Sequence, residues 1–346
     1  MRFLSFRRLF LFLAVVGPGV VTANMDNDAG GITTYSLAGA AFGYKLLCTL
    51  IPITIALIVI QEMCARMGAV TGNGMADMIR ERFGVKITFF AMLGLLLADL
   101  GNTISEFAGV AASMELFGVN KYISVPLGAL LVWGLVVRGS YKSVERVFLV
   151  ACGLYLCYVA SGFLAHPPWG EVMRELVVPN FSLNSSYLTM LVGVVGTTRG
   201  DSGANHPYLT MLVGVVGTTI APWMQFYLQA AVVEKGITVK DYGYSRIDVI
   251  AGCFMVNVVA LFIIVSCAAT LHVHGIQIES AQDAALALAP LAGKWASWLF
   301  ALGLLNASLF SASILPLATA YFICEAFGIE AGVDKSWEEA PVFYWL

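Results

Sequence analysis

Long apolar stretches alternate with short polar ones along the whole chain. Runs without Asp, Glu, Lys or Arg cover residues 9–25, 46–61, 87–98, 122–137, 147–170, 176–198, 202–233, 249–278 and 295–324. A membrane-spanning helix needs about 20 mostly apolar residues. With one duplicated segment set aside, the pattern therefore predicts eight spans, at 9–40, 46–67, 86–117, 122–138, 146–166, 208–234, 247–271 and 294–325.

The composition supports a chain whose solvent is lipid. Charged residues make up 12% of the sequence, against about 25% in soluble domains, and the mean hydropathy is +0.82. A net charge of −3 gives no electrostatic basis for binding nucleic acid. The seven cysteines all fall in apolar stretches and are interpreted as small core residues rather than as disulfides or a zinc site. We expect an all-α polytopic membrane protein.

The positive charges are distributed unevenly between the two sides of this layout. Fourteen of the 19 Lys and Arg residues fall on the side of the N-terminus, and five fall on the other side: Lys45, Lys121, Arg174, Arg199 and Lys294. Cytoplasmic loops carry the excess of basic residues in membrane proteins. The count predicts a multi-pass protein of the cell membrane with a cytoplasmic N-terminus.

Two irregularities interrupt the pattern. The segment 187–198 is repeated letter for letter at 208–219. The second copy runs directly into the apolar residues that follow, so we expect it to be the working one and 185–207 to be a supernumerary segment and linker. At the other end, 341–346 begins a new apolar run, and we expect the chain to be truncated after about eight spans.

The first span contains residues that do not suit a helix interior. Residues 22–31 read TANMDNDAGG, and Asn, Asp and paired Gly favour turns over a continuous helix. Acids at membrane depth are costly unless a cation or a cavity receives them. We expect a helix broken near Asp26 and Asp28. The alternative is that the span ends at Met25 and both acids lie in an external loop.

A similar interruption lies in the sixth span, where residues 217–223 read GTTIAPW. Proline removes a backbone hydrogen bond and frees a carbonyl upstream. Interrupted helices at corresponding positions of two halves point to an inverted-repeat transporter with its site at the midplane. A simple proline kink is the alternative.

Several segments resemble the Nramp divalent-metal transporters. They are 17–19 (GPG), 42–47 (FGYKLL), 71–74 (TGNG), 79–83 (IRERF), 105–109 (SEFAG), 303–305 (GLL) and 325–327 (EAF), together with Asp26. The resemblance implies one transporter domain over 1–346 with a LeuT-like fold. Residues 1–166 would form the first five-helix repeat and 208–346 an incomplete second repeat.

The departures from the family pattern bear on the substrate. The family carries Asp-Pro-Gly-Asn in the first break, where this chain has Asp26, Asn27, Asp28 and Ala29. In the sixth span the family's Met before Pro and His after it are replaced by Ala221 and Trp223. This pattern resembles the Nramp-related magnesium transporters. Carboxylates, carbonyls and water suit Mg2+, whereas a thioether favours softer ions.

We therefore predict a metal site formed by Asp26, Asp28, the carbonyl of Ala221 and Gln225. A helix–helix hydrogen bond is an equally good reading of Gln225. Glu106 matches an acidic position on the family's proton route, but the family's preceding Asp is Thr103 here.

The predicted function is alternating-access transport of a partly hydrated divalent ion, Mg2+ and also Mn2+, without proton coupling. The alternative is a proton-coupled Mn2+/Fe2+ symporter of the ordinary Nramp kind, and a chain that transports nothing is a third possibility. We find no motif of a membrane-embedded enzyme. No cofactor is expected, and the partners are the metal ion and the lipid bilayer, with the protein as a monomer.

Overall fold

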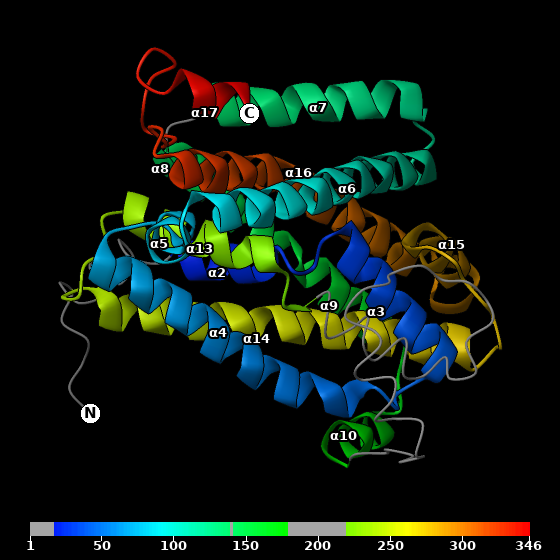
Figure 1. Cartoon of the computed structure of the whole chain (residues 1–346). Helices are drawn as coiled ribbons and strands as arrows, with labels where there is room; N and C mark the ends of the chain where they lie inside the picture. Colours follow the sequence, from blue (N-terminus) through cyan, green and yellow to red (C-terminus); the bar gives the residue numbers. More distant parts are fainter. Residues whose placement is uncertain (1–16, 139–140, 179–218) are drawn as a thin grey trace, which may run out of the picture.

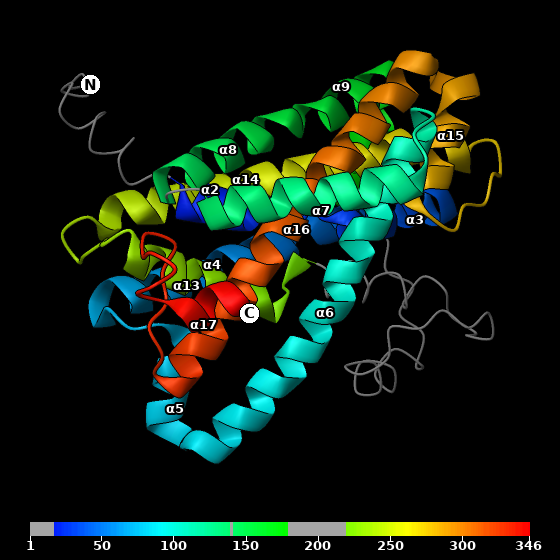
Figure 2. The ribbon, with the colours of Figure 1, turned by 90° about the horizontal axis from the view of Figure 1, so that it is seen from above.

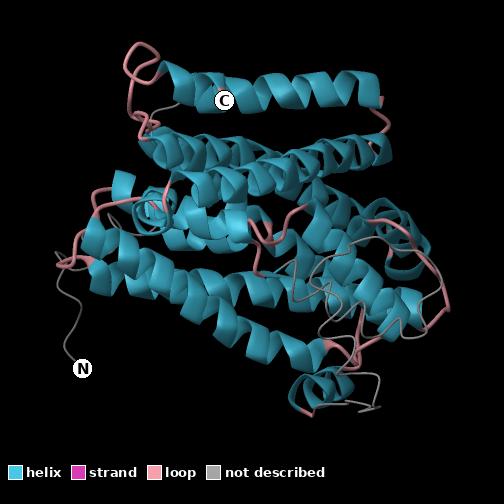
Figure 3. Ribbon diagram, in the orientation of Figure 1, coloured by secondary structure: helices cyan, strands magenta, loops and turns pink. Residues whose placement is uncertain are grey.

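A computed structural model describes residues 17–138, 141–178 and 219–346. Every regular element within these ranges is a helix (Figure 3). Five helical stretches there are long and apolar enough to cross a membrane: Leu47–Thr71, Val85–Leu116, Glu145–Leu164, Tyr242–His272 and Lys294–Phe327. Lys121–Val137 is a shorter apolar helix. Together they correspond to the second, third, fourth, fifth, seventh and eighth predicted spans.

The first span is broken, as the sequence predicts. Helix α2 covers Pro18–Asn24 and helix α3 covers Ala29–Phe42. Between them the chain turns through residues 25–28, where Asp26 is 2% exposed and Asn27 is fully buried. The acids therefore do not lie in an exposed external loop.

The following helices carry the chain across the molecule four times. A short 3-10 turn, η1 (Leu47–Thr49), leads into α4 (Leu50–Thr71). Helix α5 (Met75–Phe83) is an additional short helix in the predicted loop, and α6 (Val85–Leu116) and α7 (Lys121–Arg138) follow. The fifth span is divided at Tyr155 into α8 (Tyr141–Leu154) and α9 (Leu156–Leu164). A further short helix, α10 (Trp169–Val177), was not predicted.

The second half begins, within the described residues, at the sixth span. Helix α13 (Pro222–Glu234) is followed by α14 (Tyr242–Cys267), which ends in a π-helical turn, η2 (Ala268–His272). Helix α15 (Ala281–Ala292) was not predicted, and it precedes the long α16 (Lys294–Phe327). A short helix, α17 (Pro341–Trp345), begins at the apolar run near the C-terminus.

The broken first span lies at the centre of this arrangement. In Figure 1, α2 and α3 run between α14 and α16, and Figure 2 shows α6 at the periphery. Of the positions in the apolar stretch of α16, 72% are buried, against 17% in α6. Phe90 and Ile104 on α6 are each 71% exposed. Helix α6 therefore presents large apolar side chains on its exposed face.

Two glycines allow α2 to approach α14 closely. A Cβ atom on Gly19 would lie 2.5 Å from the backbone nitrogen of Val249. A Cβ atom on Gly252 would lie 2.6 Å from the carbonyl oxygen of Gly19. Any larger residue at either position would push the two helices apart. This close contact therefore fixes the position of α2, and with it the position of the break that follows α2.

Some sequence predictions fall outside the described residues. They include residues 185–207, the first copy of the repeat and all of its second copy except Thr219. The N-terminal part of the first span, up to residue 16, also lies outside.

Candidate functional site

Hydrogen bonds tie the turn between α2 and α3 to three surrounding elements. The Asn27 side-chain amide donates a hydrogen bond to the carbonyl of Val256 on α14 (3.2 Å). The Tyr155 hydroxyl, at the division between α8 and α9, donates to the carbonyl of Asn27 (3.2 Å). Ser311 on α16 donates to the carbonyl of Met25 (3.5 Å). The last two contacts satisfy carbonyls of the turn that a continuous helix would have paired internally.

Asp26 lies inside this turn with only half of its carboxylate paired. Its Oδ2 atom accepts a hydrogen bond from the Tyr35 hydroxyl (3.2 Å). Its Oδ1 atom is buried and has no hydrogen-bond partner. An unpaired carboxylate oxygen away from water carries a large desolvation cost. A positively charged ligand at Oδ1 would remove that cost.

Asp28 has a structural task at the start of α3. Its Oδ1 atom accepts a hydrogen bond from the backbone nitrogen of Gly31 (2.6 Å), which makes it the N-cap of that helix. The carboxylates of Asp26 and Asp28 are close enough to repel each other. Asp28 therefore contributes negative charge near Asp26 while one of its oxygens is engaged by the helix.

Glu106 brings a third acid to the same turn. Its Oε2 atom accepts a hydrogen bond from the backbone nitrogen of Ala29 (3.2 Å), and its carboxylate interacts with that of Asp28. Even so, no three His, Cys, Asp or Glu side chains in the described ranges are grouped closely enough to hold a metal ion. An ion at Asp26 would therefore need carbonyl, amide or water oxygens to complete its shell.

The sixth span meets the first at Tyr35. The Tyr35 hydroxyl lies 2.8 Å from Oγ1 of Thr219, the residue two positions before Ala221. Ala221 has an extended backbone (φ −75°, ψ 136°), and α13 begins at Pro222 directly after it. The structure therefore brings the interrupted parts of the two spans together, as the sequence predicts. Trp223 is buried (2% exposed), in the place where the family pattern has His.

Gln225 is buried, but its amide oxygen faces α4. That oxygen accepts a hydrogen bond from the thiol of Cys64 (3.6 Å), while the amide nitrogen has no partner. A metal ion binds the oxygen of an amide rather than its nitrogen. Gln225 would therefore have to exchange its contact with Cys64 before it could ligate an ion.

Several other buried polar atoms around the turn have no hydrogen-bond partner. They are Thr22 Oγ1, Asn24 Oδ1, Asn27 Oδ1, Gln61 Nε2 and Asn257 Oδ1. Buried polar atoms are normally paired, so these atoms are able to bond to water or to an ion. The sequence reasoning found the acids but missed these neutral groups, because their gathering depends on contacts between distant spans.

Other polar residues of the spans have ordinary structural partners. Glu62 and Arg66 form an ion pair on α4 (3.7 Å). A ring nitrogen of His272 lies 2.9 Å from the carbonyl of Ala40, and one of His274 lies 2.7 Å from that of Thr270. Thr103, which replaces a family acid, donates to the carbonyl of Asp99 on its own helix (2.8 Å).

The sequence and the fold together define a class of protein: a polytopic membrane protein built around a broken, acid-bearing helix. The profile of the family described as natural resistance-associated macrophage protein-like, Nramp, matches residues 19–199 and 201–345. The chain belongs to this family of transporters, and it is not an enzyme. Its place in the family and its several apolar helices make it a multi-pass membrane protein.

Similar proteins are found among bacterial transporters. The divalent metal cation transporter MntH of Chromohalobacter salexigens is 28% identical over 337 residues, which cover 92% of this chain and 72% of the relative. MntH of Erwinia tasmaniensis is 27% identical over 315 residues, which cover 88% and 70%. Among solved structures, a mutant of the manganese transporter of Eremococcus coleocola is similar, with a TM-score of 0.77 and 21% identity over 96% of this chain and 69% of that one. This structural similarity supports a LeuT-like fold for this chain.

Proposed function

We propose that the chain carries a partly hydrated divalent metal ion across the membrane by alternating access, favouring Mg2+ and also accepting Mn2+. The observation that carries the proposal is the buried Oδ1 atom of Asp26, which has no partner at the turn where the first span meets the sixth. The names of the similar MntH and manganese transporters support a divalent metal as the substrate class.

The chemistry of the groups around Asp26 supports a hard ion. The candidate donors are carboxylate, carbonyl, hydroxyl and amide oxygens, and Ala221 stands where the family pattern has the sulfur of Met. Mg2+ prefers oxygen ligands and keeps several of its waters. In this proposal Asp26 binds the ion directly, the carbonyl of Ala221 binds it from the sixth span, and Asp28 and Gln225 act through water or after a change of partner.

Transport without proton coupling is the second part of the proposal. A proton route through a membrane needs a series of titratable side chains. Here Trp223 and Thr103 replace two titratable residues of the family pattern, and Thr103 is bonded to its own helix. We also propose a cytoplasmic N-terminus, supported by the uneven distribution of Lys and Arg, and inverted repeats over 1–166 and 208–346.

A proton-coupled Mn2+ carrier is the second candidate. It is favoured by the names of the similar proteins and by Glu106, which contacts the turn of the first span at Ala29. The two candidates differ in the fate of protons, while both require Asp26.

Uptake into liposomes separates these candidates. Purified chain is reconstituted with a pH dye in the lumen, and Mg2+ and Mn2+ entry is followed without an imposed pH gradient. We expect uptake of both ions without acidification, and none by the Asp26→Ala variant. Asp248→Asn on α14 removes another buried acid, one whose two oxygens both accept hydrogen bonds, and should leave uptake in place. Metal-dependent acidification of the lumen would establish the proton-coupled carrier instead.

A further inference from the structure

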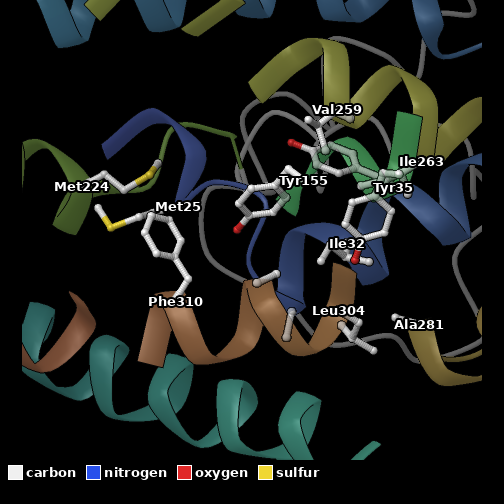
Figure 4. Packing of buried hydrophobic residues seen from close by; sticks show 14 of the residues in the cluster. Met25, Ile32, Tyr35, Tyr155, Met224, Val259, Ile263, Ala281, Leu304 and Phe310 are labelled. Carbon is white, nitrogen blue, oxygen red and sulfur yellow. The ribbon is translucent and has the colours of Figure 1, made fainter. Parts of the chain in front are cut away.

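The hydroxyl of Tyr35 is shared between the two interrupted spans. Tyr35 lies on α3 and is fully buried, and Figure 4 shows it beside Ile32 in the packed cluster that also contains Tyr155. Its hydroxyl donates to Oδ2 of Asp26 (3.2 Å) and lies 2.8 Å from Oγ1 of Thr219. A phenol has a single proton to donate. While that proton is given to Asp26, the hydroxyl oxygen accepts from Thr219.

This bond makes the two oxygens of Asp26 unequal. Oδ2 is held by the Tyr35 hydroxyl, and Oδ1 is buried without a partner. An ion that approaches the carboxylate therefore meets one oxygen without a competing bond, Oδ1, whereas Oδ2 has one lone pair taken by the hydroxyl. To bind both oxygens at once, the ion would have to compete at Oδ2 with a hydroxyl that is fixed on its other side by Thr219.

One-oxygen binding distinguishes between small and large divalent ions. Mg2+ requires near-octahedral geometry with ligands at about 2.0–2.1 Å, whereas Ca2+ takes six to eight oxygens at about 2.3–2.6 Å and readily binds a carboxylate through both oxygens. A carboxylate with one oxygen already engaged by a hydrogen bond suits one-oxygen binding of Mg2+ but weakens the second oxygen as a ligand for Ca2+. The effect depends on the Tyr35 hydroxyl alone, because the ring packs in the core whether or not it carries the hydroxyl.

We propose that Tyr35 is a specificity-determining residue that discriminates against Ca2+ by competing with the ion for Oδ2 of Asp26. The proposal rests on the proposed function, because it needs Asp26 to bind the transported metal. Tyr35 itself positions the carboxylate and does not touch the ion.

The test compares the affinities of Mg2+ and Ca2+ for the purified full chain by calorimetry. Tyr35→Phe frees Oδ2, and we expect the ratio of Ca2+ to Mg2+ affinity to rise about tenfold, since a hydrogen bond to a charged group is lost. Tyr158→Phe is the matched control, because Tyr158 is 1% exposed and its hydroxyl has no partner. That variant should keep the wild-type ratio.

Two outcomes distinguish failure of this proposal from failure of the proposed function. If Asp26→Ala abolishes binding but Tyr35→Phe weakens both ions equally, or changes neither, the role of Tyr35 is only structural and the proposal is overturned. If Asp26→Ala binds both ions normally, the metal site itself is wrong. Should Tyr35→Phe fail to fold, Thr219→Val releases the hydroxyl from its other side and should raise the ratio by a smaller factor. An unchanged ratio in that variant would also contradict the proposal.

Discussion

Two buried aspartates lie at opposite ends of α2, and they are bonded very differently. At the N-terminal end, Asp248 of α14 accepts hydrogen bonds from the backbone nitrogens of Gly17 (3.2 Å), Gly19 (2.7 Å) and Val20 (3.3 Å), using both of its oxygens. Just past the C-terminal end, Asp26 accepts one hydrogen bond and leaves the other oxygen unpaired. Both carboxylates are almost completely buried, at 1% and 2% exposure.

In our proposal, this difference separates a structural acid, Asp248, from a metal-binding one, Asp26. Asp248 meets the free N–H groups at the positive end of a helix, where a carboxylate is stabilised without any ligand. Asp26 follows the end of the same helix where free carbonyls gather, and its remaining oxygen lacks a donor from the protein. Burial alone therefore does not mark a binding residue.

The largest expected effect on stability comes from Asp248→Ala. Removal of this carboxylate leaves the first N–H groups of α2 without an acceptor, so we expect the free energy of unfolding to fall by about 3 kcal/mol. Thermal unfolding in detergent measures this loss. Asp248→Asn keeps one acceptor oxygen and should lose less, and an Asp248→Ala protein as stable as wild type would contradict the structural role.

The next effect concerns ion choice at the sixth span. Ala221→Met adds a thioether beside the proposed site, and we expect the ratio of Mn2+ to Mg2+ affinity to rise about tenfold, because sulfur suits softer ions and displaces a water that Mg2+ retains. Competition binding measures the ratio. Ala91→Met, on an exposed position of α6, is the control, and equal ratios in the two variants would refute the placement of Ala221.

A smaller and mixed effect is expected at Asp28. Asp28→Ala removes the N-cap of α3 and should lower the free energy of unfolding by about 1 kcal/mol, with metal affinity weakened but retained. Asp28→Asn keeps a good cap without the charge. We expect Asp28→Asn to be as stable as the wild-type protein in a melting curve. Its metal affinity, measured by calorimetry, should stay as weak as that of Asp28→Ala. Full recovery of affinity by Asp28→Asn would mean that the charge has no part in binding.

The sequence predicts the main features of the fold because they depend on local chemistry. The break between α2 and α3 follows from Asn, Asp and Gly in an apolar run, and the long helices follow from charge-free stretches of sufficient length. Helices α10 and α15 were missed because a search for spans of about 20 residues passes over shorter helices. For α15 a signal was present, since Ser280 and Asp283 form a capping box.

The bonding of the site could not be predicted in the same way. The Tyr35 hydroxyl joins Asp26 to Thr219, which lies 184 positions after Tyr35, and no spacing within the sequence indicates that contact. The turn of Gln225 toward Cys64 likewise depends on the rotation of α13 after Pro222. For Asp28 the N-cap role was legible in the sequence, as an Asp directly before a helix.

The most direct test of the account compares Asp26→Ala and Asp248→Ala in one pair of measurements, metal binding by calorimetry and unfolding by a melting curve. We predict that Asp26→Ala loses Mg2+ binding while its melting temperature stays near that of the wild-type protein. We predict that Asp248→Ala melts lower while the folded protein still binds Mg2+. A well-folded Asp26→Ala protein that binds Mg2+ with full affinity would contradict the proposed metal site.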